Sequence, residues 1–169
     1  MIKVTPKDRP FAPKTDEAIP TLYIYRDVLE EIRFNGGWRE GKLAAGILVG
    51  QPYICPFNEA TYIEIEGFIS GTHVPEVSDL TRYLRTQWKA ASAAQKHSFP
   101  SAQIVGWYLA TGADDLEIGQ DGLLLHHTFF SQSWQQGLVM YGEKGLHALS
   151  ADGDKFVDAP VATIIPRSE

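Results

Sequence analysis

Cysteine and long apolar runs are scarce in this sequence, and both shortages exclude classes of protein. Cys55 is the one cysteine among 169 residues. An internal disulfide framework and a structural zinc site built on several cysteines are therefore excluded. No window approaches the roughly 18 consecutive apolar residues of a membrane-spanning helix, and the first ten residues lack the apolar core of a secretion signal. We therefore expect a cytoplasmic protein without a membrane partner.

Positive charge is also in short supply. The chain has 15 Lys and Arg residues against 21 Asp and Glu residues, which gives a formal net charge of −6. Because an acidic surface repels a phosphate backbone, we expect no nucleic-acid partner. The remaining composition, 44% hydrophobic and 21% charged, is typical of a globular protein, and the length suits one domain.

Prolines mark the two ends of the expected domain. Residues 1–20 contain four prolines, which exclude a helix and favour extended backbone. We interpret this segment as an arm that is either loosely packed or extended along a partner. The domain is expected over residues 21–156. Residues 157–169 are expected to form a C-terminal tail, with room for a final short strand.

The hydrophobic pattern between these ends predicts strands that alternate with helices. Helices are expected to begin near Asp27 and Ser78, which both suit helix N-termini, and a third is expected over residues 120–131. Near-continuous apolar runs predict buried strands over residues 43–50 and 102–109, and the alternation over residues 61–69 predicts a strand with one solvated side. Further strands are expected over residues 21–25, 138–141 and 146–149. This order predicts an α/β or α+β fold, in which one mixed sheet carries helices on its faces.

In this order the segments resemble the MPN/JAMM domain family. The strand Leu22–Tyr25 and the helix after it are similar to the family's first strand and helix. Gly-Ile-Leu-Val-Gly at residues 46–50 resembles its second strand, G-x-L-x-G, and Val-Gly-Trp-Tyr at residues 105–108 resembles its hallmark strand. The strand over residues 137–141 follows at the expected distance. The resemblance covers roughly residues 20–150 and implies the MPN/JAMM (cytidine deaminase-like) fold.

The resemblance also shows which catalytic residues are missing. Catalytic members of the family are zinc hydrolases that carry His-x-His after the hallmark strand, then Ser-x-x-Asp, with a glutamate before the second strand. These positions hold Leu109 and Thr111 for the histidines, Gly119 and Gly122 for the serine and aspartate, and Leu43 for the glutamate. Leucine and glycine side chains offer no lone pair to a metal, and threonine does not replace a neutral imidazole. We therefore expect no metal, no cofactor and no catalytic residue.

For a domain without its metal, the resemblance implies a scaffold. Metal-free members pair with another copy or with a catalytic relative, so we expect a non-catalytic adaptor, either a homodimer or a heterodimer with a related domain. Exposed aromatic residues would mark its contact surface, and Trp38, Tyr53 and Phe57 lie in stretches expected to be loops. Two alternatives remain: a hydrolase with a non-standard site, and a module that binds a small ligand in the vacated metal cleft.

A pair of adjacent histidines, His126 and His127, falls within the third predicted helix. Neighbouring residues on a helix point about 100° apart, so the two rings do not converge on one ion. We expect one histidine to face inward and the other to lie at the surface.

Overall fold

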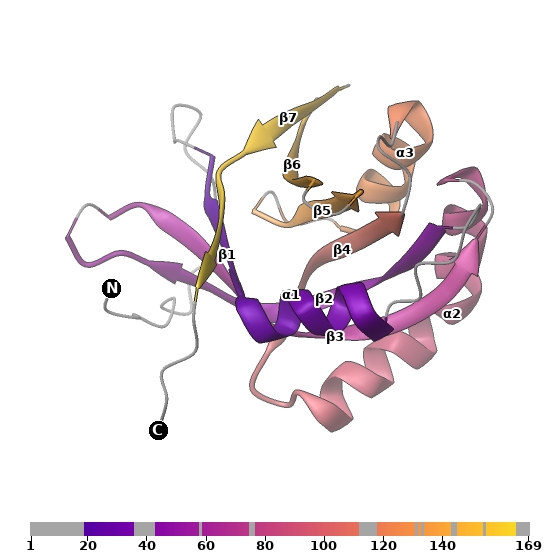
Figure 1. Ribbon diagram of the computed structural model, residues 1–169, viewed down its shortest axis with the longest axis horizontal. Coiled ribbons are helices and arrows are strands. Elements are labelled where there is room, and N and C mark those ends of the chain that lie inside the picture. The colour runs from indigo at the N-terminus through magenta and orange to yellow at the C-terminus, as the bar shows by residue number, and fades with distance from the viewer. Residues whose placement is uncertain are drawn as a thin grey trace.

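The computed structural model describes residues 19–35, 43–57, 59–74, 77–111, 118–130, 132, 134–142, 145–153 and 155–164. Within these residues the chain forms eight strands and three helices (Figure 1), in the order β1 (Thr21–Tyr25), α1 (Arg26–Asn35), β2 (Leu43–Ile54), β3 (Thr61–Val74), α2 (Val77–Ser98), β4 (Gln103–Thr111), α3 (Gly119–Phe129), β5 (Gln136–Tyr141), β6 (Gly145–Asp152), β7 (Lys155–Ala159) and β8 (Val161–Ile164). The three predicted helices are confirmed as α1, α2 and α3.

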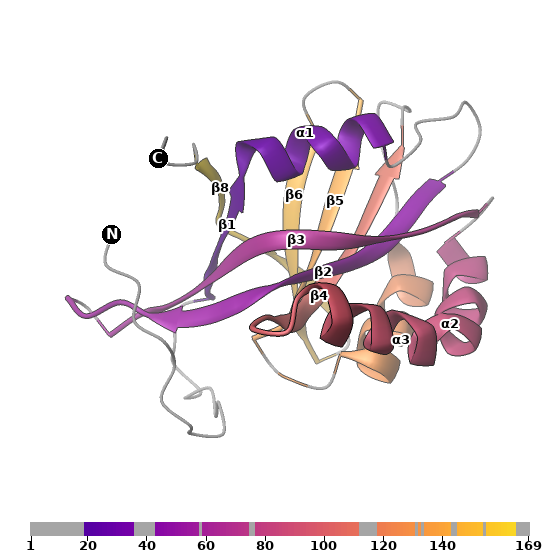
Figure 2. The ribbon, with the colours of Figure 1, turned by 90° about the horizontal axis from the view of Figure 1, so that it is seen from below.

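All eight strands belong to one mixed sheet, in the order β7-β6-β5-β4-β2-β3-β1-β8. Strand β1 runs parallel to both β3 and β8, and β4 runs parallel to β5, whereas the other neighbours are antiparallel. Figure 2 shows α1 on one side of the sheet and α2 with α3 on the other. The predicted α+β class, a mixed sheet with helices on its faces, is confirmed. Within the described residues, no helix is long and apolar enough to cross a membrane.

The sheet curls until its two edges meet. Strands β7 and β8 lie at opposite ends of the strand order, yet Pro160 alone separates them in the chain. The Leu22 N–H donates to the Pro160 carbonyl over 2.8 Å. The buried Gln136 side chain, at the start of β5, donates from Nε2 to the Pro20 carbonyl over 2.8 Å. One bent segment therefore closes the sheet by pairing with β6 before the bend and with β1 after it.

Because of this closure, the sheet extends past residue 156, where the domain was expected to end. The predicted boundary after residue 156 falls inside β7, and the predicted tail contains all of β8. The expected final strand is present, but it belongs to the sheet because β8 pairs with β1 and Val161 packs against the buried core. Residues 1–18 and 165–169, which hold most of the predicted arm and the end of the predicted tail, lie outside the described residues.

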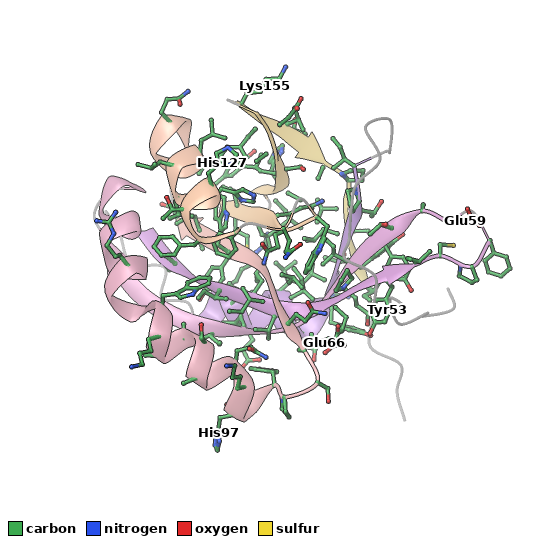
Figure 3. The ribbon with its side chains drawn as sticks, turned by 180° about the vertical axis from the view of Figure 1, so that it is seen from behind. Tyr53, Glu59, Glu66, His97, His127 and Lys155 are labelled. Atoms are coloured by element: carbon green, nitrogen blue, oxygen red, sulfur yellow. The ribbon has the colours of Figure 1, made fainter. Side chains whose placement is uncertain are left out.

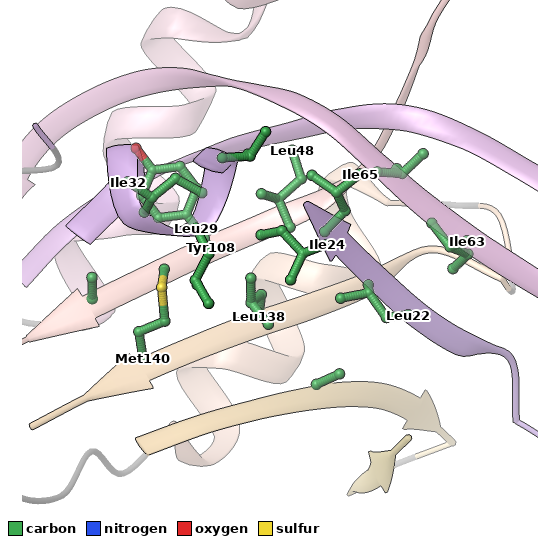
Figure 4. Close-up of a cluster of buried hydrophobic side chains, with 14 of the residues drawn as sticks. Leu22, Ile24, Leu29, Ile32, Leu48, Ile63, Ile65, Tyr108, Leu138 and Met140 are labelled. Carbon is green, nitrogen blue, oxygen red and sulfur yellow. The ribbon is translucent and has the colours of Figure 1, made fainter. Parts of the chain in front are cut away.

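Alternate side chains along the strands fill two apolar clusters, one on each face of the sheet. The inner core lies inside the curl, where α1 packs on β1, β3 and β8, and the other strands contribute further side chains to the same cluster. Figure 4 shows part of it, including Leu22, Ile24, Leu29, Ile32, Leu48, Ile63, Ile65, Tyr108, Leu138 and Met140. The outer core lies under α2 and α3, and its fully packed members are Ala45, Ile47, Trp107, Leu109, Leu125, Phe130 and Val139. Since side chains of a strand alternate between faces, neighbouring residues of β4 serve different cores.

The pairing of β4 with β5 depends on a glycine. Gly106 lies opposite Gln136 in the parallel register, and a Cβ added at Gly106 would overlap with the Gln136 carbonyl oxygen. The obstacle is backbone rather than a mobile side chain, so the two strands would have to separate to admit a methyl group.

We expect Gly106→Ala to lower the free energy of unfolding by about 1–3 kcal/mol, the usual effect of overpacking. Urea denaturation followed by circular dichroism measures the change. Thr163→Ala, at an exposed position of β8, serves as the control and should change stability by no more than about 0.5 kcal/mol. Equal stability of the Gly106→Ala chain and the parent would contradict the β4–β5 register.

Candidate functional site

The positions that the resemblance assigns to a metal site lie at one end of two neighbouring strands and on the helix that follows. Leu43 begins β2, and the next residue, Ala44, pairs with Ala110 of β4, between Leu109 and Thr111. Gly119 and Gly122 lie in the first turn of α3. The backbone therefore brings these positions to the same region of the fold, although the side chain of Leu43 lies outside the described residues.

Leu109 is sealed inside the outer core. Its side chain is 0% exposed and packs in the cluster that contains Trp107 from the same strand and Leu125 from α3. Thr111, two residues further along β4, is also buried. Apolar packing thus occupies the position where the resemblance places the first histidine, and this position has no contact with solvent.

The first turn of α3 is packed just as closely. A Cβ added at Gly122 would overlap with the side chain of Ile118 and would lie 3.4 Å from the ring of Phe156. The absence of a side chain at Gly122 therefore lets Ile118 and Phe156 close over the helix. An aspartate at this position would displace Ile118, so the local packing suits glycine rather than a carboxylate ligand.

A hydrogen bond between two buried side chains crosses this part of the outer core. Trp107 Nε1 on β4 donates to Nδ1 of His126 on α3 over 3.0 Å, and both residues are buried. The rings of Phe130 and Phe156 each lie 5.8 Å from the His126 ring, centroid to centroid. Because Nδ1 accepts a hydrogen bond, the neutral imidazole carries its proton on Nε2.

The expectation for the adjacent histidines is confirmed. His126 faces inward, whereas His127 is exposed and places Nε2 2.8 Å from the Gly153 carbonyl oxygen. Burial, with a smaller contribution from the neighbouring His127, lowers the pKa of His126 from 6.5 to about 4. The buried imidazole is therefore neutral at pH 7 and acts as a packing group with one hydrogen-bond partner in Trp107. In the described part of the chain, no three His, Cys, Asp or Glu side chains come together to hold a metal ion.

The three aromatic residues predicted to mark an interface differ in where they lie. Trp38 lies outside the described residues. Phe57 is 79% exposed in the turn between β2 and β3, as a loop residue would be. The expected loop position of Tyr53 is wrong, because β2 pairs with β3 as far as Ile54. Tyr53 is only 8% exposed and stacks on Tyr62 with ring centroids 5.4 Å apart.

Around Tyr53 the structure gathers polar and aromatic groups that sequence reasoning missed. We call this group the tyrosine face, and its members are Tyr23, Tyr25, Gln51, Tyr53, Tyr62, Glu64 and Glu66. The Tyr25 hydroxyl donates to Glu64, and the Tyr53 hydroxyl donates to Glu66 over 3.5 Å. Figure 3 shows Tyr53 and Glu66 close together at the base of the β2–β3 hairpin. The alternation along residues 61–69 had indicated one solvated side of the strand, but Tyr62 and Glu64 on that side are buried.

Comparison with known proteins defines a fold and no family. No family model matches the sequence, and no curated protein matches it either. Among solved structures, the solution structure of protein DSY2949 from Desulfitobacterium hafniense matches with a TM-score of 0.57. The two sequences are 14% identical, and the match covers 86% of this chain and 94% of the other. At this identity the likeness concerns the fold alone.

We expect acid to destabilise the protein through His126. Its pKa falls from 6.5 to about 4 on folding, so between these values the unfolded chain binds a proton that the folded chain does not. The free energy of unfolding should therefore decrease as the pH falls from 6.5 to 4, by up to about 3 kcal/mol from this group. Urea denaturation at pH 7, 6, 5 and 4, followed by tryptophan fluorescence, measures the loss.

Two variants separate His126 from the carboxylates that titrate in the same range. His126→Phe should lose less stability than the parent between pH 6.5 and 4, because the titrating group is gone. His127→Gln, at the exposed neighbour, should keep most of the parent's dependence. Identical pH dependence in the parent and in His126→Phe would refute the assignment.

Proposed function

We propose that this chain is a metal-free MPN-like domain that acts as a non-catalytic scaffold in a protein assembly. The observation that supports this proposal most directly is the complete burial of Leu109 in the outer core. A catalytic zinc site needs about three protein ligands and an open position for water. At the corresponding place this chain has a leucine without solvent contact, which supports a structural use of the region.

The imidazole on α3 supports the same conclusion. His126 already accepts a hydrogen bond from Trp107 at Nδ1, and aromatic rings surround it. Its lowered pKa keeps it neutral, so it carries no charge with which to stabilise an anionic intermediate. The Trp107–His126 pair holds β4 against α3 with neutral groups, and the described members of the outer core are apolar.

The arrangement of elements supports the MPN/JAMM-like assignment of the fold. A strand and helix open the domain, β2 lies in the middle of the sheet, and the strand with Trp107 is followed by α3 and a parallel strand. This is the order that the sequence resemblance implied for residues 20–150. The assignment to that family is our proposal, since the matching solved structure supports the general fold only.

A scaffold contributes surfaces, and two large apolar side chains stand out among the described residues. Phe57 is 79% exposed at the tip of the β2–β3 hairpin, and Leu124 is 59% exposed on α3. We propose a protein partner, either a second copy of the chain or a related domain.

We expect the purified protein to contain no stoichiometric zinc and to show no peptidase activity, because the donor atoms of a zinc site are absent from the matching positions. Inductively coupled plasma mass spectrometry after dialysis against metal-free buffer measures the zinc content. About one tightly bound zinc per chain would contradict the proposal and favour a hydrolase with a non-standard site. A strict monomer in light scattering, with no protein captured from the native cell, would contradict the scaffold role.

Leu109→Ala distinguishes a packed core from a ligand cleft at the vacated metal position. We expect it to lower the free energy of unfolding by about 2–5 kcal/mol, the usual effect of truncating a buried leucine. Leu124→Ala, at an exposed leucine, is the matched control and should cost no more than about 0.5 kcal/mol. A loss at Leu109 as small as that at Leu124 would favour a cleft and a small-ligand module.

A further inference from the structure

We propose that the outer side of α2 binds an acidic helix of a partner protein through Arg85, Lys89 and Lys96, three exposed side chains that we call the basic ridge. This inference rests on the proposed scaffold function and names the chemistry of the partner. The observations that support it are the position of the ridge on α2, its exposure, its charge within an acidic chain and the exposed alanines beside it.

The basic ridge is a straight row of side chains on the side of α2 that faces away from the sheet. Since an α-helix turns by about 100° per residue and rises 1.5 Å, Arg85, Lys89 and Lys96 lie within an arc of about 40° and span about 16 Å. Trp88 and Ala91 leave the helix on its other side and pack against the outer core. That packing fixes the rotation of α2, so the ridge faces solvent.

The three basic side chains are free to meet a partner. Each is exposed, and within the described part of the chain none of them takes part in a hydrogen bond or an ion pair. On α1, by contrast, Arg26 already pairs with Glu30 over 3.2 Å. Arg85 and Lys89 lie one helical turn apart, where like charges destabilise a helix. An anionic partner would relieve this repulsion.

The charge of α2 differs from that of the whole protein. The chain has a formal net charge of −6, yet residues 80–113 contain no Asp or Glu. The same stretch contains Arg82 in addition to the three residues of the ridge. Carboxylates are the protein groups that complement such a concentration of positive charge. The ridge therefore selects an acidic partner.

Two exposed alanines, Ala90 and Ala93, favour a helix as that partner. They lie on α2 between Lys89 and Lys96 in the sequence, and their side chains end at Cβ. A partner helix can therefore approach α2 closely between the long basic side chains. If it carries carboxylates four residues apart, they match the spacing of Arg85 and Lys89, and both ion pairs form together.

Other occupants suit the ridge less well. Two-fold pairing of copies through α2 would bring Arg85, Lys89 and Lys96 against the same residues of the partner copy. A phosphate backbone would be repelled by the acidic remainder of the chain. A membrane-surface helix needs large apolar side chains beside its basic ones, whereas the exposed neighbours described on α2 include only alanines as apolar residues.

The test uses the full-length chain and two fluorescein-labelled alanine-rich peptides of eighteen residues. One peptide carries glutamate at every fourth position, and the other carries lysine there. Fluorescence anisotropy at 50 mM and 500 mM NaCl measures Kd. We expect the glutamate peptide to bind, more weakly at high salt because exposed charges are screened, and the lysine peptide not to bind.

Substitutions on α2 test the ridge and the close approach separately. Arg85→Gln, Lys89→Gln and Lys96→Gln should each raise Kd by up to about fivefold, as for an exposed ion pair, and together by about three- to a hundredfold. Ala93→Gln changes no charge, but its longer side chain would hold the two helices apart. It should raise Kd about threefold or more, because the centre of an interface is closely packed.

The matched control is Lys155→Gln, which removes an exposed lysine from β7 and should change Kd less than about twofold. No binding of the glutamate peptide, or an equal loss in Lys155→Gln, would overturn the docking site. An unchanged Kd in Ala93→Gln would overturn the close approach of a helix.

Two further measurements assign the ridge to a different occupant if the proposal is wrong. Double-stranded DNA or phosphatidylserine vesicles that bind more tightly than the glutamate peptide, and lose binding in the triple variant, would assign it to phosphate groups. A dimer in light scattering that dissociates in the triple variant would assign it to a second copy. Bound zinc would instead refute the scaffold proposal, so the two failures are separable.

Discussion

The structure depends on the closure of its sheet at Pro160. Strands β7 and β8 lie at opposite ends of the strand order, and the single residue between them brings the two ends of the sheet together. The curled strands therefore surround much of the inner core. The bond from Gln136 to the Pro20 carbonyl ties β5 to the entry of β1 at the same seam. Helix α1 lies inside the curl, and α2 and α3 lie on the outer face.

That outer face shows how one fold can carry different functions. The start of β2 lies beside the end of β4, where Ala44 pairs with Ala110, and α3 packs against the same outer core. This region holds Leu109, Gly122 and the Trp107–His126 bond, and each of them favours close packing. Function depends on the side chains placed on a fold rather than on the fold itself. The proposed scaffold role rests on this close packing.

The local sequence pattern predicted most of the helices and strands. It did not predict the contacts between residues that lie far apart in the sequence. The strand over residues 21–25 and the helices after Asp27 and Ser78 were evident because each has its own periodicity and start signal. The pairing of β8 with β1 was not, since nothing near Val161 indicates a partner at Leu22. In the candidate site, the absence of histidine at residues 109 and 111 was visible in the sequence. The Trp107–His126 bond and the burial of Glu64 were not, because both depend on neighbours from other elements.

The bend at Pro160 has a consequence for how the protein is made on the ribosome. Residues 22 and 161 must meet to complete the sheet, and nearly the whole chain lies between them. Contacts so distant in sequence form late, because the entropy of a large loop must be overcome first. The nascent chain therefore leaves one edge of β1 unpaired until residues 161–164 have been translated, and unpaired strand edges of this kind favour aggregation before folding is complete.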